Sequence, residues 1–123
     1  MEGLFVTGFA QMSEEGFWRL IRDRYSSNQV IWECKNYATL AAGDFHQTAY
    51  YMNDAIGNFV VVCFRGEVKK HYFQHIRRIS DKGGMVILLD DGDLKTFIRQ
   101  SLNGKVKETH IRQIYDDTTR AIS

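Results

Sequence analysis

The feature that most constrains the fold of this chain is one uninterrupted apolar run. Residues 59–64 read "FVVVCF" and contain no charged or strongly polar side chain. A strand with one face in water alternates polar and apolar residues, whereas a strand covered on both faces is apolar throughout. The run therefore predicts a strand of a parallel sheet that is flanked by helices.

The rest of the chain alternates between strand and helix patterns. The predicted strands cover residues 3–9, 30–35, 59–64 and 85–89. The predicted helices cover 13–25 with Ser13 as the N-cap, 43–55, 67–80, 92–102 and 105–121. In these helices Tyr50 and Val68 occupy expected apolar positions. This order predicts an α/β domain with a largely parallel or mixed core sheet flanked by helices.

Length and composition indicate one folded domain over residues 1–123. A chain of 123 residues is enough for one ordinary domain, and its 44% hydrophobic residues are enough for one core. It contains no proline, and we find no repeat or linker. The formal net charge of +1 neither indicates nor excludes a nucleic-acid partner, because local patches matter more than totals.

The cysteines and the apolar runs predict where the protein resides. Cys34 and Cys63 each lie in an apolar run and are interpreted as buried, reduced thiols, a disulfide between neighbouring strands being the weaker alternative. No apolar run approaches the roughly 20 residues that span a bilayer, and no signal-peptide pattern opens the chain. We therefore expect a cytoplasmic protein.

One predicted strand, within "VIWECKNY" at residues 30–37, carries two opposite charges. Alternate residues of a strand face the same side, so Glu33 and Lys35 project together while Cys34 faces away. Three interpretations remain open. The pair could be a surface ion pair, a buried structural ion pair, or part of a metal-dependent hydrolytic site. In the third case the carboxylate would ligate Mg²⁺, and the ammonium would orient water or stabilise charge on a phosphate.

The surroundings of the pair add a resemblance. "VIWECKNY", the helix "DFHQTAYYM" after Gly43, and "GNFVVVCFRG" together resemble the PD-(D/E)XK nuclease superfamily, and most of all its restriction-endonuclease-like, Mrr-type branch. The match covers residues 29–66. The resemblance implies a three-layer core with a mixed sheet flanked by helices. The matching positions are Glu33, Lys35, Asn36, Gln47 and Tyr51.

The resemblance also implies roles for these residues. Glu33 would be a ligand of Mg²⁺ or Mn²⁺, and the backbone carbonyl of Cys34 would complete the coordination. Lys35 would position or activate the attacking water. Gln47 would support the site, and Tyr51 would contact nucleic acid.

The chain departs from the family pattern upstream of the pair. The family has an acidic residue near the start of an earlier strand, and usually a helix and a strand before that. Glu2 is the best positional candidate for this second catalytic and metal-binding carboxylate. The other candidates are Glu14, Glu15 and Asp23, whose more ordinary interpretation is the solvated side or first turn of a helix. The chain is then one piece of a longer protein, or a minimal or degenerate member.

Three further groups of residues have competing interpretations. One is a basic stretch that forms either a solvated helix face or a set of phosphate contacts: Lys69, Lys70, Arg77, Arg78 and Lys82. In the second interpretation Lys105, Lys107 and Arg112 add to these contacts. His71 and His75 have metal-ligand spacing, but exposed histidines are the favoured interpretation. Asp90, Asp91 and Asp93 fit a helix N-terminus better than a Ca²⁺ loop.

Together these observations predict a metal-dependent endonuclease domain that hydrolyses phosphodiester bonds. DNA is favoured over RNA, in a defence or repair setting. The resemblance also allows a homodimer and an attached regulatory or NTPase domain. The alternatives are a degenerate module of the same fold that binds nucleic acid or regulates attached domains, and a small α/β interaction domain in which Glu33 and Lys35 are only an ion pair.

Overall fold

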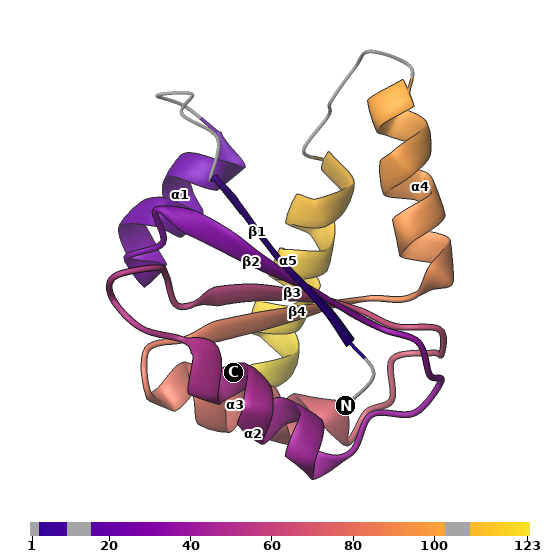
Figure 1. Ribbon diagram of the computed structural model, residues 1–123, viewed down its shortest axis with the longest axis horizontal. Helices are drawn as coiled ribbons and strands as arrows, with labels where there is room; N and C mark the ends of the chain where they lie inside the picture. Colours follow the sequence, from indigo (N-terminus) through magenta and orange to yellow (C-terminus); the bar gives the residue numbers. More distant parts are fainter. Residues whose placement is uncertain (1–2, 10–15, 103–108) are drawn as a thin grey trace.

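The computed structural model describes residues 3–9, 16–102 and 109–123 (Figure 1). It is an α/β fold in which helices flank a sheet. The elements in chain order are β1 (Gly3–Phe9), α1 (Phe17–Tyr25), β2 (Gln29–Lys35), α2 (Ala42–Tyr51), β3 (Phe59–Cys63), α3 (Tyr72–Asp81), β4 (Met85–Leu89), α4 (Asp91–Leu102) and α5 (Thr109–Ile122). The predicted α/β class is confirmed.

The sheet has the strand order β1-β2-β3-β4. Strands β2, β3 and β4 are all parallel, because α2 and α3 each return the chain to the starting end of the next strand. Strand β1 pairs antiparallel with β2 at the edge, with Phe5 opposite Glu33 and Gly3 opposite Lys35. The resemblance implies a mixed core sheet. In the structure β2, β3 and β4 are instead all parallel, and among the described strands only the pairing of β1 with β2 is antiparallel.

Different helices cover the two faces of the sheet (Figure 1). On one face lie α2 and α3, where the rings of Phe45 and Tyr72 have centroids 5.8 Å apart. On the other face α1 meets α5, and the ring of Tyr115 lies 5.5 Å from Phe17 and 6.3 Å from Phe59. Helix α5 also packs along β4 and reaches α3. Glu33 and Lys35 project toward α2, so the candidate site lies on the α2–α3 side.

Strands β3 and β4 form the centre of the core. Every residue of both strands is buried, as is Phe64 directly after β3. The prediction of a strand covered on both faces is confirmed, although the strand ends at Cys63 rather than at Phe64. The run 85–89 is buried on both faces in the same way.

Several helix boundaries differ from the predictions. Helix α2 ends at Tyr51 rather than near 55, because the Asn53 side chain accepts hydrogen bonds from the backbone N–H groups of Ala55 and Ile56, both at 2.9 Å, and turns the chain. Tyr50 is 84% exposed, so its predicted apolar position was wrong. Helix α3 begins at Tyr72 rather than 67 and leaves Val68 at the surface.

The ends of α1 and α4 test the predicted caps. Gly16 precedes α1 at the N-cap position, and the predicted cap Ser13 lies outside the described residues. At α4 the backbone N–H of Asp93 donates to Asp90 Oδ1 at 2.8 Å, and that of Asp90 donates to Asp93 Oδ2 at 3.2 Å. This reciprocal capping confirms the interpretation of the aspartates as a helix N-terminus.

The cysteines are both free thiols, as predicted, but only one is buried. Cys63 is buried, and burial raises the pKa of its thiol to about 12. Cys34, paired with it across β2 and β3, is exposed, so the prediction of two buried thiols was wrong for Cys34. Among the described helices, none is long and apolar enough to cross a membrane.

Candidate functional site

Glu33 and Lys35 lie at the carboxyl end of β2 and face α2. Glu33 is 0% exposed and Lys35 is 2% exposed. Charged side chains are almost never buried to this degree unless they are paired. The interpretation as a surface ion pair was therefore wrong, and the two interpretations that remain both require a partnered charge cluster.

The cluster contains a second carboxylate that the sequence analysis did not identify. The Lys35 Nζ lies 2.6 Å from Glu33 Oε1 and 3.3 Å from Oδ1 of Asp44, which belongs to the first turn of α2. The ammonium therefore bridges a carboxylate on the strand and a carboxylate on the following helix. We call Glu33, Lys35 and Asp44 the charge cluster.

Asp44 is held in place from three sides. Its Oδ2 accepts a hydrogen bond from the backbone N–H of Ala41 at 2.7 Å, which caps the first turn of α2. Its Oδ1 accepts a hydrogen bond from the Tyr37 hydroxyl and also faces Lys35. Because both carboxylate oxygens are engaged, Asp44 is suited to fixing the position of the ammonium.

Thr48 completes the contacts of Glu33. Its Oγ1 lies 2.9 Å from Glu33 Oε2 and 2.9 Å from the Asp44 carbonyl oxygen, and one hydroxyl proton serves these two acceptors. Glu33 Oε1, by contrast, faces the Lys35 ammonium at 2.6 Å, and no further donor among the described residues reaches it. Glu33 thus keeps one buried oxygen with incomplete hydrogen bonding within the described part of the chain.

Protonation in the cluster follows from these contacts. Burial alone would lower the pKa of Lys35, but its contacts with Glu33, Tyr37 and Asp44 outweigh burial and raise that pKa. For Asp44, burial acts to raise the pKa, and the hydrogen bonds from Ala41 and Tyr37 together with Lys35 lower it overall. Lys35 is therefore an ammonium near neutral pH. It acts through its charge and its hydrogen bonds rather than as a proton acceptor.

Gln47 and Tyr51 lie on the same stripe of α2 as Asp44 and Thr48, at helical spacing. Gln47 Nε2 donates to the Tyr51 hydroxyl at 3.4 Å. Among the described side chains of α2, it is the Thr48 hydroxyl and not the Gln47 amide that donates to Glu33. The structure thus brings Gln47 and Tyr51 to each other beside the charge cluster.

The loops after β2 and β3 meet next to the cluster. The backbone N–H of Arg65 donates to the Tyr37 carbonyl at 3.1 Å, and its guanidinium donates to Asn36 Oδ1 at 3.2 Å. At Gly66 an added Cβ would lie 1.8 Å from the Ala38 carbonyl oxygen, so a side chain at this position would force the loops apart. Arg65 is therefore an exposed cation at the carboxyl ends of the strands, where ligands of α/β sheets bind.

Four residues were candidates for a further carboxylate of the site, and the structure describes one of them. Glu2, Glu14 and Glu15 lie outside the described residues. Asp23 lies on the exposed side of α1, 3.7 Å from Arg19 and 3.5 Å from Arg22. Its interpretation as part of a solvated helix face is confirmed.

No group of three potential metal-ligating His, Cys, Asp or Glu side chains occurs within residues 16–102 and 109–123. His71 and His75 do not form such a group. The His75 ring stacks on Phe45, with centroids 4.9 Å apart, and His71 packs edge-on against Tyr72. The role of the Cys34 carbonyl as a ligand stays a prediction.

The predicted nucleic-acid contacts are exposed but divide between two places. Lys69 and Lys70 precede α3, whereas Arg77 and Arg78 lie on it. Arg78 and Lys82 line a cavity between α2 and α3, described below. Arg112 is exposed on α5, and Lys105 and Lys107 lie outside the described residues.

The sequence analysis missed Tyr37, Asp44 and Thr48. A signal for two of them was present. Asp44 and Thr48 are four residues apart in the helix directly after the E-x-K strand, so they share a helix face. The sequence does not indicate that this face of the helix packs against the strand that carries Glu33 and Lys35.

Comparisons of this chain with protein-family models, with curated proteins and with solved structures found no match. The function proposed below therefore rests on the residues of the site and on the resemblance of its motifs.

Proposed function

We propose that this chain is a metal-dependent nuclease domain of the PD-(D/E)XK type that hydrolyses phosphodiester bonds, with DNA as the favoured substrate. The observation that carries the proposal is the charge cluster. It places an ammonium between two carboxylates at the carboxyl end of a strand in a parallel sheet. Burying such a cluster is costly, and a well-packed apolar cluster would generally be at least as stable, so a function is a reason for its presence.

The donor set partly fits a divalent cation. Carboxylate oxygens are the ligands that Mg²⁺ and Mn²⁺ prefer, and Glu33 Oε1 is a buried oxygen with incomplete hydrogen bonding. Glu33 would hold the metal together with the Cys34 carbonyl and Glu2, which the family pattern implies. Such a metal supplies Lewis acidity toward the phosphoryl oxygen and lowers the pKa of bound water.

The chain's own residues would then have separate roles. Lys35, kept protonated by its neighbours, would stabilise negative charge that develops on the phosphate. Asp44 and Tyr37 would position Lys35, and Thr48 would orient Glu33. Arg65 and Tyr51, both exposed beside the cluster, would contact the substrate backbone.

The test is cleavage of linear and plasmid DNA, and of a matched RNA, in Mg²⁺, Mn²⁺ or EDTA. Glu33→Gln keeps the size of the side chain and an acceptor for Thr48 while it removes the ligand charge. Asp23→Asn is the matched control, because Asp23 is an exposed carboxylate on α1. We expect metal-dependent cleavage that Glu33→Gln abolishes and Asp23→Asn retains. Glu2→Gln, measured in parallel, tests the second carboxylate.

A second candidate function has its own supporting observation. The side chains of Glu33 and Lys35 are both fully buried, so a phosphodiester bond reaches them only if neighbouring segments rearrange. This favours a non-catalytic module of the same fold that binds nucleic acid through its exposed cations. A well-folded wild type that binds DNA with a steep salt dependence but cleaves nothing in either metal would overturn the nuclease proposal and support this module.

A further inference from the structure

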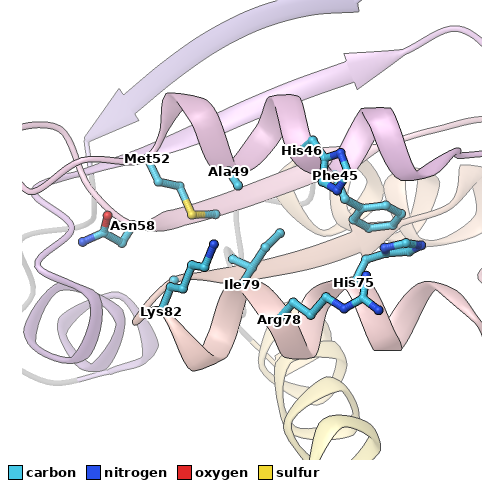
Figure 2. Close-up of a pocket in the computed structure, with 10 residues that line it drawn as sticks. Phe45, His46, Ala49, Met52, Asn58, His75, Arg78, Ile79 and Lys82 are labelled. Carbon is cyan, nitrogen blue, oxygen red and sulfur yellow. The ribbon is translucent and has the colours of Figure 1, made fainter.

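A second site lies between α2 and α3, outside the charge cluster. The two helices enclose a cavity of about 290 Å³, close to the lower end of the range for small-molecule sites. Figure 2 shows His46 on the α2 side and His75, Arg78 and Lys82 on the opposite side, with Asn58 at one end. None of the charge-cluster residues lines this cavity.

The polar lining of the cavity is cationic. Arg78 and Lys82 carry full charges and the imidazoles of His46 and His75 lie beside them, whereas none of the described acidic side chains lines the cavity. In the described part of the chain neither Arg78 nor Lys82 takes part in an ion pair. One lining residue, Asn58, contacts a carboxylate outside the cavity lining, since its Nδ2 donates to Asp54 Oδ1 at 2.9 Å.

The titration of His75 is consistent with this uncompensated charge. Burial lowers the pKa of His75, and so do the nearby charges of Arg78, His46 and His71. A like-charged surrounding disfavours a further positive charge, and an anion bound among these groups would reverse the effect.

The shape of the cavity adds a preference for an organic ligand. Its walls include Phe45, Met52 and Ile79, and the Phe45 ring stacks on His75 with an angle of 16° between the ring planes. A cavity with an apolar wall and a few convergent polar groups is the usual form of a small-molecule site. Arginine beside lysine and histidine is the donor set that recognises phosphate, because the guanidinium can bind two phosphate oxygens at once.

We propose that the α2–α3 cavity binds the phosphate group of a nucleotide, held by Arg78, Lys82 and the two histidines. The phosphate belongs either to a free nucleotide or to the backbone of a nucleic-acid strand. This site does not depend on the proposed nuclease activity, since it shares no lining residue with the charge cluster.

The test is an NMR titration of the full chain that follows the histidine ring signals. The probes are inorganic phosphate, a nucleoside 5′-monophosphate and a short single-stranded DNA. We expect saturable shifts of His46 and His75, and a higher pKa of His75 in the bound state. Tighter binding of the monophosphate than of the oligonucleotide identifies a free nucleotide as the ligand, and the reverse order identifies the strand backbone.

Variants separate this site from general charge attraction. Arg78→Gln with Lys82→Gln should weaken binding at least about tenfold, because both full charges of the lining are lost. Arg77→Gln is the matched control, since Arg77 is exposed on the same helix and does not line the cavity. Equal weakening by the control, or no binding of any of the three probes, overturns the proposal. The cavity shares no lining residue with the charge cluster, so loss of DNA cleavage in Glu33→Gln and loss of monophosphate binding in Arg78→Gln with Lys82→Gln are independent results.

Discussion

Two groups of charged side chains lie on opposite sides of helix α2, and they differ in burial and in ion pairing. On its side toward β2, Lys35 is fully buried and bridges the carboxylates of Glu33 and Asp44. On its side toward α3, Arg78 and Lys82 are exposed and take part in no ion pair among the described residues. The first group satisfies its charges internally, and the second leaves its charges available to a ligand. The two sites should therefore respond differently to substitution.

The largest expected effect is on the buried side. Lys35→Met removes the cation and leaves Glu33 and Asp44 without compensation, so it should lower the free energy of unfolding by about 3–5 kcal/mol. Urea denaturation measures this. Lys95→Met is the control, because Lys95 is exposed on α4 and its substitution should change the free energy by less than about 0.5 kcal/mol.

A double substitution separates the loss of pairing from the loss of packing. If uncompensated charge is the cause, Glu33→Leu combined with Lys35→Met should regain most of the stability lost in Lys35→Met alone. A double variant no more stable than the single one would show instead that the cluster holds α2 against β2 through its specific contacts.

A smaller effect is expected at Thr48. Thr48→Val keeps the shape of the side chain and removes the hydroxyl near Glu33 Oε2, which leaves a buried oxygen without its donor at a cost of about 1–3 kcal/mol. Thr96→Val is the matched control. Thr96 makes the same kind of contact to a carbonyl four residues earlier, that of Gly92, but reaches no buried carboxylate. Equal losses in both variants, measured by thermal or urea unfolding, would contradict a special role of the bond to Glu33.

The decrease in the free energy of unfolding at acid pH tests the contribution of Asp44 to stability. Because the pKa of Asp44 is lowered in the folded state, its contribution is fully present above the ordinary value of 3.8 and is lost as the pH falls through the lower folded value. Lys35 and Tyr37 are the groups that face it. Asp44→Asn should therefore flatten the decline in stability below about pH 4, measured by urea unfolding at a series of pH values. An unchanged decline would assign acid sensitivity to other carboxylates.

The central strand and the buried pair could be predicted from the sequence, whereas the contacts of that pair could not. Strand β3 was predictable because its short, continuous apolar run with three consecutive valines favours a fully covered strand, and Glu33 and Lys35 were predictable because alternation in a strand fixes their common face. The partners of that pair were not. Asp44 reads equally well as a capping residue, which it also is, and only the placement of α2 over β2 shows that its second contact is Lys35.

Local polar contacts account for the wrong boundaries. Asn53 continues an apparently helical pattern in sequence, yet its side chain binds two backbone N–H groups ahead of it and ends α2 early. The cavity between α2 and α3 is tertiary in origin, since His46 and Arg78 come from different helices. A run of basic residues on one helix predicts a charged face, but it does not indicate which of those residues meet a neighbouring element.

The smallest expected effect on stability belongs to the cavity. Arg78→Gln removes a charge that has no partner in the described structure, so the free energy of unfolding should change by less than about 0.5 kcal/mol. The pKa of His75 should nevertheless rise toward its ordinary value of 6.5, because Arg78 is among the groups that lower it. The other groups that act on that ring are His71, directly before α3, and His46 on α2, and both stay in place. NMR titration of His75 in the wild type, in Arg78→Gln and in Arg77→Gln measures the shift. A rise in Arg78→Gln alone would locate the uncompensated charge inside the cavity. An equal rise in both variants would spread it over the whole surface of α3, and the two sides of α2 would then differ in burial but not in the presence of a specific anion site.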